Sequence, residues 1–197
     1  MRSYAINEIF YSLQGEGNHA GTPALFIRFA GCNLRCPFCD TDFSKSERWT
    51  IWELEGYFQN LNPYPPMVVL TGGEPTLQVD LDLCALLHRY FDLVAIETNG
   101  TTPKVAGGVD WVTLSPKEDY TIGKCALRHA DEVKVVFDGE HDPEKWLKIK
   151  AEHYYLQPCD TGNPEKNREI LESCISYILD HPQWKLSLQT QKIINVK

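Results

Sequence analysis

The stretch Gly31-Cys32-Asn33-Leu34-Arg35-Cys36-Pro37-Phe38-Cys39-Asp40-Thr41 places three thiols within eight residues, with the spacing C-x3-C-x2-C. A loop this short can turn all three sulfurs toward one centre, and no His or further Cys lies near enough in sequence to act as a fourth ligand. Structural zinc sites and electron-carrying iron–sulfur clusters require four protein ligands. Three thiolates on a four-iron cluster instead leave one iron open for a small molecule. A zinc knuckle with a remote fourth ligand, or a chance grouping of cysteines, is the alternative.

The composition is that of an ordinary globular protein. The chain has 197 residues, of which 43% are hydrophobic and 23% charged, and its net charge is −8. We therefore expect one domain over residues 1–197, and no direct nucleic-acid partner. No apolar run approaches the roughly 20 residues that span a membrane, and the first ten residues lack a signal-peptide pattern. Seven cysteines, an odd number with three of them clustered, indicate a reducing, cytoplasmic setting.

Strand and helix patterns alternate along the chain. Short apolar runs typical of buried strands occupy residues 24–30, 67–70, 93–97, 111–114, 132–137 and 154–156, after an extended segment at 5–12 and before a possible closing strand at 184–188. Helices are expected at residues 51–61, 79–91, 143–151 and 164–180. The connections 99–109 and 118–131 look too short or too broken by Pro and Gly for full helices. The pattern predicts an α/β fold, a partial (βα)6 barrel with some helices reduced or missing.

Polar motifs follow five of these predicted strands. They are the cysteine loop, Thr71-Gly72-Gly73-Glu74-Pro75, Glu97-Thr98-Asn99-Gly100, Ser115-Pro116-Lys117 and Leu156-Gln157-Pro158. Because the chemistry of such barrels collects at the carboxyl ends of the strands, we expect these motifs to share one site.

The cysteine spacing and the Gly-Gly turn after a buried strand resemble the radical S-adenosylmethionine (SAM) superfamily. The resemblance implies a [4Fe-4S] cluster on Cys32, Cys36 and Cys39, whose open iron holds the amino and carboxylate groups of SAM. Cleavage of SAM then gives a 5'-deoxyadenosyl radical. The positions that the resemblance assigns to SAM are Phe38, Asp40, Gly73, Glu74, Ser115, Lys117 and Gln157.

A further ordered set of motifs is similar to the 7-carboxy-7-deazaguanine synthases of queuosine biosynthesis. It consists of Leu13-Gln14-Gly15-Glu16-Gly17, Arg28, Cys39-Asp40-Thr41 and Ser115-Pro116-Lys117. The resemblance implies that 6-carboxytetrahydropterin loses ammonia to give a contracted ring, with SAM regenerated. It implies Mg2+ on Thr41, an electron donor such as flavodoxin or ferredoxin, and a homodimer. The implied substrate-binding residues are Leu13, Gln14, Gly15, Glu16, Arg28 and Thr71.

The residue chemistry agrees with such a substrate. Gln14 and Glu16 can pair with the amide-and-amine edge of a pterin, and Arg28 can hold a carboxylate with two parallel hydrogen bonds. Strand alternation puts Arg28 on one face with Phe26 and Ala30, and we expect that face to point into the site. The alternative for Arg28 is a structural ion pair with Glu16 or Asp42.

Several cysteines and the C-terminal segment stand apart from this pattern. Cys84 and Cys174 lie on apolar helix faces and are expected in the core, whereas Cys125 and Cys159 have no assignable role. The chain has Gln191 where the resembling family often has His, so the resemblance leaves substrate contact by this segment open. A glycyl-radical activase, or a metal-stabilised binding module without catalysis, is the competing function.

Overall fold

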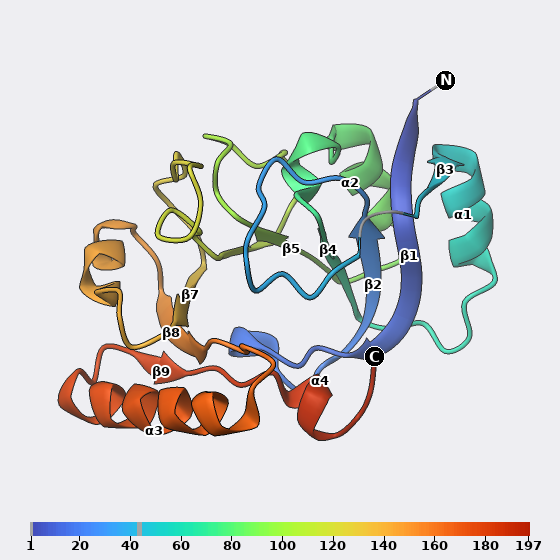
Figure 1. The fold of residues 1–197 in the computed structure, drawn as a ribbon. Coiled ribbons are helices and arrows are strands. Elements are labelled where there is room, and N and C mark those ends of the chain that lie inside the picture. The colour runs from blue at the N-terminus through green and yellow to red at the C-terminus, as the bar shows by residue number, and fades with distance from the viewer. Residues whose placement is uncertain (1, 43–44) are drawn as a thin grey trace.

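The computed structural model describes residues 2–42 and 45–197. In these residues nine strands form one sheet in the order β3-β1-β2-β4-β5-β6-β7-β8-β9 (Figure 1). The strands are β1 (Ser3–Leu13), β2 (Pro23–Phe29), β3 (Glu47–Thr50), β4 (Met67–Gly72), β5 (Leu93–Thr98), β6 (Trp111–Leu114), β7 (Glu132–Phe137), β8 (His153–Pro158) and β9 (Lys185–Leu186). All pairs from β2 to β9 are parallel, so their carboxyl ends meet at one edge.

The amino-terminal edge of the sheet is antiparallel. β1 pairs with β2 and also with β3, a short strand that the sequence pattern did not predict. Leu13 lies opposite Pro23, the first residue of β2, so the chain leaves β1 at the amino end of the parallel strands. The segment from Gln14 to His19 therefore enters the barrel from the side opposite the cysteine loop.

The helices begin and end at recognisable capping residues. They are α1 (Ile51–Gln59), α2 (Leu81–Leu87), α3 (Pro164–Asp180) and α4 (Thr190–Ile193), with 3-10 turns η1 (Gly17–His19), η2 (Pro75–Leu77) and η3 (Pro143–Lys148). Thr50 and Glu53 form the expected capping box of α1, and Asn163 caps α3. No helix of the described residues is long and apolar enough to cross a membrane.

Two predicted helices are wrong in extent or kind. α2 is shorter than residues 79–91 because the Asp80 carboxylate accepts the N–H of Leu83, which fixes the start of the helix after Asp80. The predicted helix at 143–151 is the 3-10 turn η3, which ends before Ile149, a residue with extended backbone. As expected, the connections 99–109 and 118–131 contain no helix in the part of the chain that is described.

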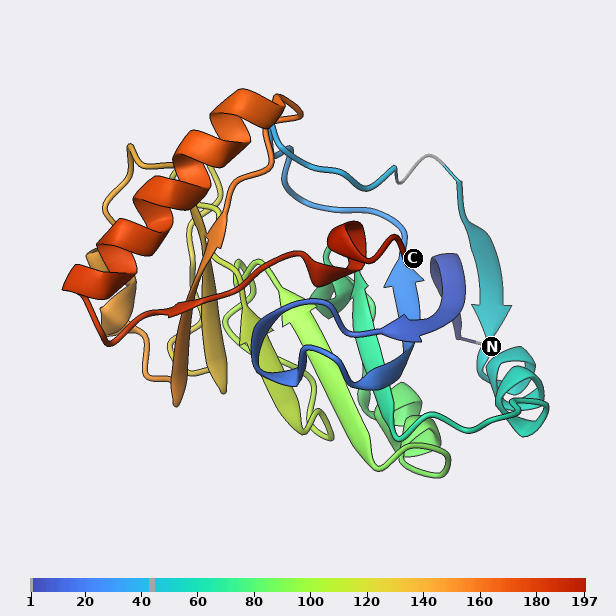
Figure 2. The same cartoon turned by 90° about the horizontal axis from the view of Figure 1, so that it is seen from below.

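The sheet packs apolar side chains on both faces. Leu25, Ile27 and Phe29 lie in the cluster beneath α1 and α2, whereas Ala24 and Phe26 face the other side with Met67, Val69 and Ala95. A further cluster packs β6–β8 against η3 and α3. The segment after β1 and the C-terminal tail both lie on the inner side of the sheet (Figure 2). This open α/β barrel with few helices confirms the predicted fold class.

Candidate active site

A cavity of about 290 Å³ lies on the inner side of the sheet, and nearly all of the predicted site residues line it. From the cysteine loop these are Cys32, Cys36, Phe38, Cys39, Asp40 and Thr41. From the strands and the segment after β1 they are Leu13, Gln14, Gly15, Glu16, Arg28, Thr71, Gly73, Ser115, Lys117 and Gln157. The strand-end motifs therefore lie around one cavity, which is the arrangement that the sequence analysis expected.

The cysteine loop is held against the turn that follows β4. The N–H of Glu74 donates to the carbonyl of Gly31 at 2.9 Å, and a Cβ on Gly73 would lie only 1.8 Å from that oxygen. Only glycine allows the two backbones to cross this closely. The crossing fixes the cysteine loop over the cavity.

The thiols of this loop form a donor set for an iron–sulfur cluster. Cys32, Cys36 and Cys39 are all free and face the same cavity, and burial raises the pKa of Cys32 and of Cys36. Within the described residues, no three His, Cys, Asp or Glu side chains lie close enough to hold one metal ion. Three free thiols at one cavity can supply the three cysteine ligands of a four-iron cluster whose remaining iron is open.

Glu74 is placed differently from the other predicted residues. Its side chain is 1% exposed and is not part of the cavity lining. The carboxylate accepts hydrogen bonds from the hydroxyls of Thr76 and Thr98 and from the N–H of Asn99. These contacts tie the turn after β4 to the end of β5, so the side chain of Glu74 stabilises the loop that carries Gly73.

Ser115 and Lys117 form a polar pair at the end of β6. The Lys117 ammonium donates to the carbonyl of Ser115 at 3.0 Å and also to its hydroxyl. Burial lowers the pKa of Lys117 to about 8, although Cys36 acts in the opposite direction. Gln157, at the end of β8, accepts from the hydroxyl of Ser187 at 3.1 Å. Phe38 packs edge-on against Tyr120, with ring centroids 4.7 Å apart.

Arg28 points to the cavity, as strand alternation predicts, but its ion-pair partner is Glu8. The Arg28 Nε lies 2.8 Å from a Glu8 oxygen, and Nη1 donates to the Thr41 hydroxyl at 3.3 Å. Glu8 also pairs with Lys197, near the end of the chain. The predicted alternative partners were Glu16 and Asp42, and the contact with Glu8 corrects that expectation.

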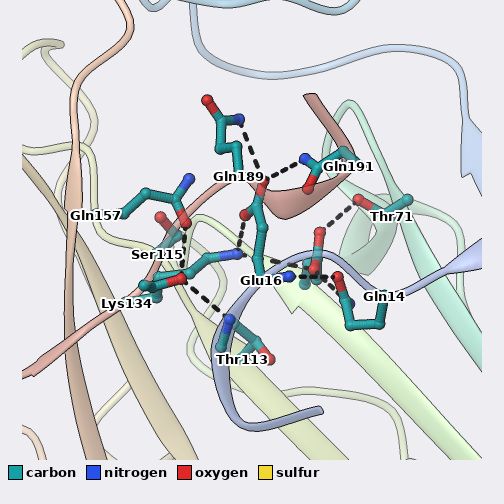
Figure 3. A network of polar contacts seen from close by, with 12 residues as sticks. Gln14, Glu16, Thr71, Thr113, Ser115, Lys134, Gln157, Gln189 and Gln191 are labelled. Atoms are coloured by element: carbon teal, nitrogen blue, oxygen red, sulfur yellow. Dashed lines mark hydrogen bonds and ion pairs between the residues drawn. The ribbon is translucent and has the colours of Figure 1, made fainter. Parts of the chain in front are cut away.

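Glu16 is the centre of a buried polar network, shown in Figure 3. One carboxylate oxygen contacts the ammonium of Lys134, and the other accepts from the amides of Gln189 and Gln191 at 3.1 and 2.9 Å. Burial would raise the pKa of Glu16, but the Lys134 charge and these hydrogen bonds outweigh it and lower the pKa to about 2. Glu16 is therefore ionised at neutral pH.

Glu97 is a second carboxylate at the same cavity. It accepts from the Gln14 amide at 3.1 Å and from the Thr71 hydroxyl at 2.9 Å, and it lies 3.8 Å from the Lys134 ammonium. The sequence placed Glu97 in a strand-end motif but assigned it no role. Lys134 was missed altogether, although a lysine inside an apolar strand is a signal in itself, because a buried charge needs a partner.

The C-terminal segment also reaches the cavity. Gln189, Gln191 and Lys192 line it, and Lys192 forms ion pairs with Asp40 at 3.1 Å and Asp160 at 2.8 Å. Sequence analysis left the position of this segment open, because Gln191 departs from the family pattern. Cys84 and Cys174 are buried in the core as predicted, and Cys159 lines the cavity.

Comparisons with known proteins agree with this geometry. Residues 26–149 match the model of the radical SAM superfamily. A 7-carboxy-7-deazaguanine synthase of Bacteroides thetaiotaomicron is 46% identical over 98% of this chain and 98% of its own length. One of Caulobacter vibrioides is 38% identical, with 98% of this chain and 99% of the relative covered.

A solved structure is similar as well. The crystal structure of QueE from Escherichia coli has a TM-score of 0.70 and 28% identity, and the match covers 95% of this chain and 94% of that chain. The superfamily match implies a [4Fe-4S] cluster and SAM, which suit the three free thiols that face the cavity. Full-length identity and fold together show that the chain belongs to the 7-carboxy-7-deazaguanine synthase family of radical SAM enzymes.

Proposed function

We propose that the protein converts 6-carboxy-5,6,7,8-tetrahydropterin into 7-carboxy-7-deazaguanine with loss of ammonia, a step in queuosine biosynthesis. The names of the full-length relatives support this proposal. The observation that carries it is the cavity itself, where three free thiols face the same space as the partly buried acceptors Glu16 and Glu97. A radical initiator and a site for a polar heterocycle would therefore be adjacent.

The cofactors would occupy the side of the cavity beneath the cysteine loop. When bound, the cluster and SAM supply the radical that begins the reaction. The backbone at Gly73 is free to approach the amino acid part of SAM because no Cβ intervenes. Ser115, Lys117 and Gln157 offer a hydroxyl, an ammonium and an amide for its ribose and carboxylate, with Asp40 and Phe38 as further cavity groups.

The substrate would bind deeper, between Arg28 and Glu16. Gln14, Glu16 and Thr71 surround the space where the amide-and-amine edge of a pterin can donate hydrogen bonds, with Leu13 and Gly15 beside it. The guanidinium of Arg28 has five N–H donors, and Glu8 and Thr41 use only some of them. Arg28 can therefore hold the substrate carboxylate while it stays anchored to β1.

Mg2+ would bind at Thr41 together with the substrate. The Thr41 hydroxyl faces the cavity within 3.5 Å of an Asp40 carboxylate oxygen. Mg2+ prefers oxygen ligands and retains several waters. One protein hydroxyl and the substrate carboxylate are therefore enough to hold it. A site that depends on the substrate in this way should hold Mg2+ weakly in the free enzyme.

The remaining partners follow from the same assignment. Flavodoxin or ferredoxin would deliver electrons near Cys39, which is exposed at the surface. We infer that residues 1–197 act as one radical SAM domain, because the sheet continues beyond the matched residues to β9. We also infer a homodimer, for which exposed apolar side chains such as Trp52, Leu81 and Leu179 offer surface.

The test is an anaerobic reaction of the reconstituted protein with the pterin, SAM, Mg2+ and a reductant. We expect about four irons and no zinc per chain, and a product with the mass of 7-carboxy-7-deazaguanine. A zinc-loaded protein without product would instead support a binding module. SAM cleavage that depends on a large protein partner would support an activase. Within the described residues, Cys84, Cys125, Cys159 and Cys174 form no second ligand group for that role.

A further inference from the structure

Lys134 occupies an unusual position for a lysine. It is the third residue of β7, its side chain is 6% exposed, and it lines the cavity. Its ammonium contacts the Glu16 carboxylate and lies 3.8 Å from that of Glu97. The two acids come from different elements, one from the segment after β1 and the other from β5.

This arrangement determines how the two acids face the cavity. Two carboxylates brought together without a cation would repel each other, and one of them would take up a proton. A protonated acid offers an O–H donor, whereas an ionised one is only an acceptor. The Lys134 ammonium contacts Glu16 and lies 3.8 Å from Glu97, and its positive charge reduces that repulsion at the cavity wall.

The neighbouring side chains donate hydrogen bonds to the two carboxylates but carry no charge. Thr71 and Gln14 donate to Glu97, and the amides of Gln189 and Gln191 donate to Glu16. Each of these groups hydrogen-bonds an ionised carboxylate, and none of them supplies charge. Lys134 thus supplies the positive charge next to both acids, and the Lys117 charge also acts on them electrostatically.

We propose that Lys134 is a positioning residue that sets substrate selectivity, by holding Glu16 and Glu97 as ionised acceptors for a ligand edge made of N–H donors. This inference rests on the proposed function and names the feature of the substrate that the site recognises. A reduced pterin presents a 2-amino group and a ring N–H at such an edge. The corresponding 2-oxo ring, a tetrahydrolumazine, presents a carbonyl oxygen where the amine would be.

An ionised carboxylate should reject that carbonyl. A site built for hydrogen bonding leaves buried polar groups unpaired when it meets the wrong analogue, which is a strong source of discrimination. We expect the cluster-loaded wild-type enzyme to bind 6-carboxytetrahydropterin at least about 100-fold more tightly than 6-carboxytetrahydrolumazine. The comparison uses the KM of the pterin and the inhibition constant of the lumazine.

Lys134→Met tests the role of the charge. We expect the KM of the pterin to rise at least about 30-fold and the preference over the lumazine to fall below about 10-fold, since one acid can then take a proton and donate. Lys134→Arg keeps the charge and should retain most of the preference. Lys124→Met removes a lysine whose side chain is 80% exposed and is the matched control.

The outcomes separate this inference from the proposed function. A merely structural lysine would weaken both ligands equally, so an unchanged preference in Lys134→Met would overturn the inference even if the wild-type enzyme makes product. Wild-type enzyme that makes no product would overturn the proposed function and this inference with it. If Lys134→Met does not fold, Lys134→Gln replaces it, because glutamine keeps a hydrogen-bond donor for Glu16 but no charge, and the same loss of preference is expected from it.

Discussion

Arg28 is the single residue whose substitution should most affect substrate binding without touching the cofactor. Arg28→Lys keeps the charge but loses the planar set of donors, and lysine cannot hold Glu8 and a substrate carboxylate at once. A bidentate, partly desolvated contact is worth roughly 2–4 kcal/mol, so we expect the KM of the pterin to rise about 30-fold or more. Steady-state kinetics measure this change.

The matched control for Arg28 is Arg89→Lys. Arg89 also forms an ion pair, with Glu55, but 60% of its side chain is exposed and it lies outside the cavity lining. The KM should then stay at the wild-type value. Normal pterin binding by Arg28→Lys would mean that Arg28 is a structural partner of Glu8 only.

Thr41 gives a separate prediction about Mg2+. Thr41→Ala should lower activity with iron content and SAM binding unchanged, and added Mg2+ should restore part of it, because water and substrate oxygens remain. Thr41→Ser keeps the hydroxyl and should be mild. Titration of activity against Mg2+ measures the effect. Equal losses in both variants without any Mg2+ dependence would exclude the ligand role.

Sequence analysis identified the site residues that belong to local motifs and missed residues whose contacts join different strands. Glu16 and Arg28 stand in recognisable patterns, and both line the cavity. The partners of these residues, Lys134 and Glu8, lie on other strands. Their charges point inward only because of strand register, which a linear pattern of residue types does not fix.

At the level of elements, the crossing of the cysteine loop and the turn after β4 can be tested with two glycines. Gly73→Ala would bring a Cβ to 1.8 Å from the Gly31 carbonyl, so the backbones must move apart. We expect a loss of about 1–3 kcal/mol in the free energy of unfolding, and weaker SAM binding. Denaturant unfolding and SAM titration measure the two effects.

Gly56→Ala is the control for that substitution. Gly56 lies within α1, and a Cβ there would meet nothing within 4 Å. Because alanine has the higher helix propensity, we expect α1 to gain about 1 kcal/mol. A gain in both variants, with unchanged SAM binding, would show that the close crossing does not constrain the site.

The elements also show where local pattern ceases to predict structure. The interior parallel strands were found because they are apolar on both faces, and α3 because Asn163 and Pro164 mark its start. The pairing of β3 with β1 was missed, since a short strand with exposed polar residues has no hydrophobic signature. α2 was predicted too long, as apolar residues beyond its ends belong to the core without being helical.

At the scale of the whole molecule, the ion pair between Glu16 and Lys134 joins the segment after β1 to β7 and should make stability depend on pH. The pKa of Glu16 is lowered in the folded protein from an ordinary 4.5 to about 2. A lowered pKa stabilises the fold above the unfolded value, and that stabilisation is lost as the pH falls through the folded one. The free energy of unfolding of cluster-free protein should therefore fall between about pH 5 and pH 2.

Glu16→Gln supplies the comparison for this pH dependence. It removes the titrating group, so the fall toward low pH should be smaller than in the wild-type protein, although the variant is less stable at pH 7 because Lys134 loses its closest partner. Urea unfolding at several pH values measures both curves. Parallel curves would assign the acid sensitivity to other carboxylates.

The central claim is that this cavity brings a radical initiator and a pterin together for ring contraction. The most direct measurement is the yield of 7-carboxy-7-deazaguanine and of ammonia, relative to SAM consumed, by reconstituted enzyme under reducing, anaerobic conditions. We predict product and ammonia in equal amounts, both in excess of the enzyme, with little net loss of SAM. Steady formation of 5'-deoxyadenosine while the pterin stays intact would contradict the account.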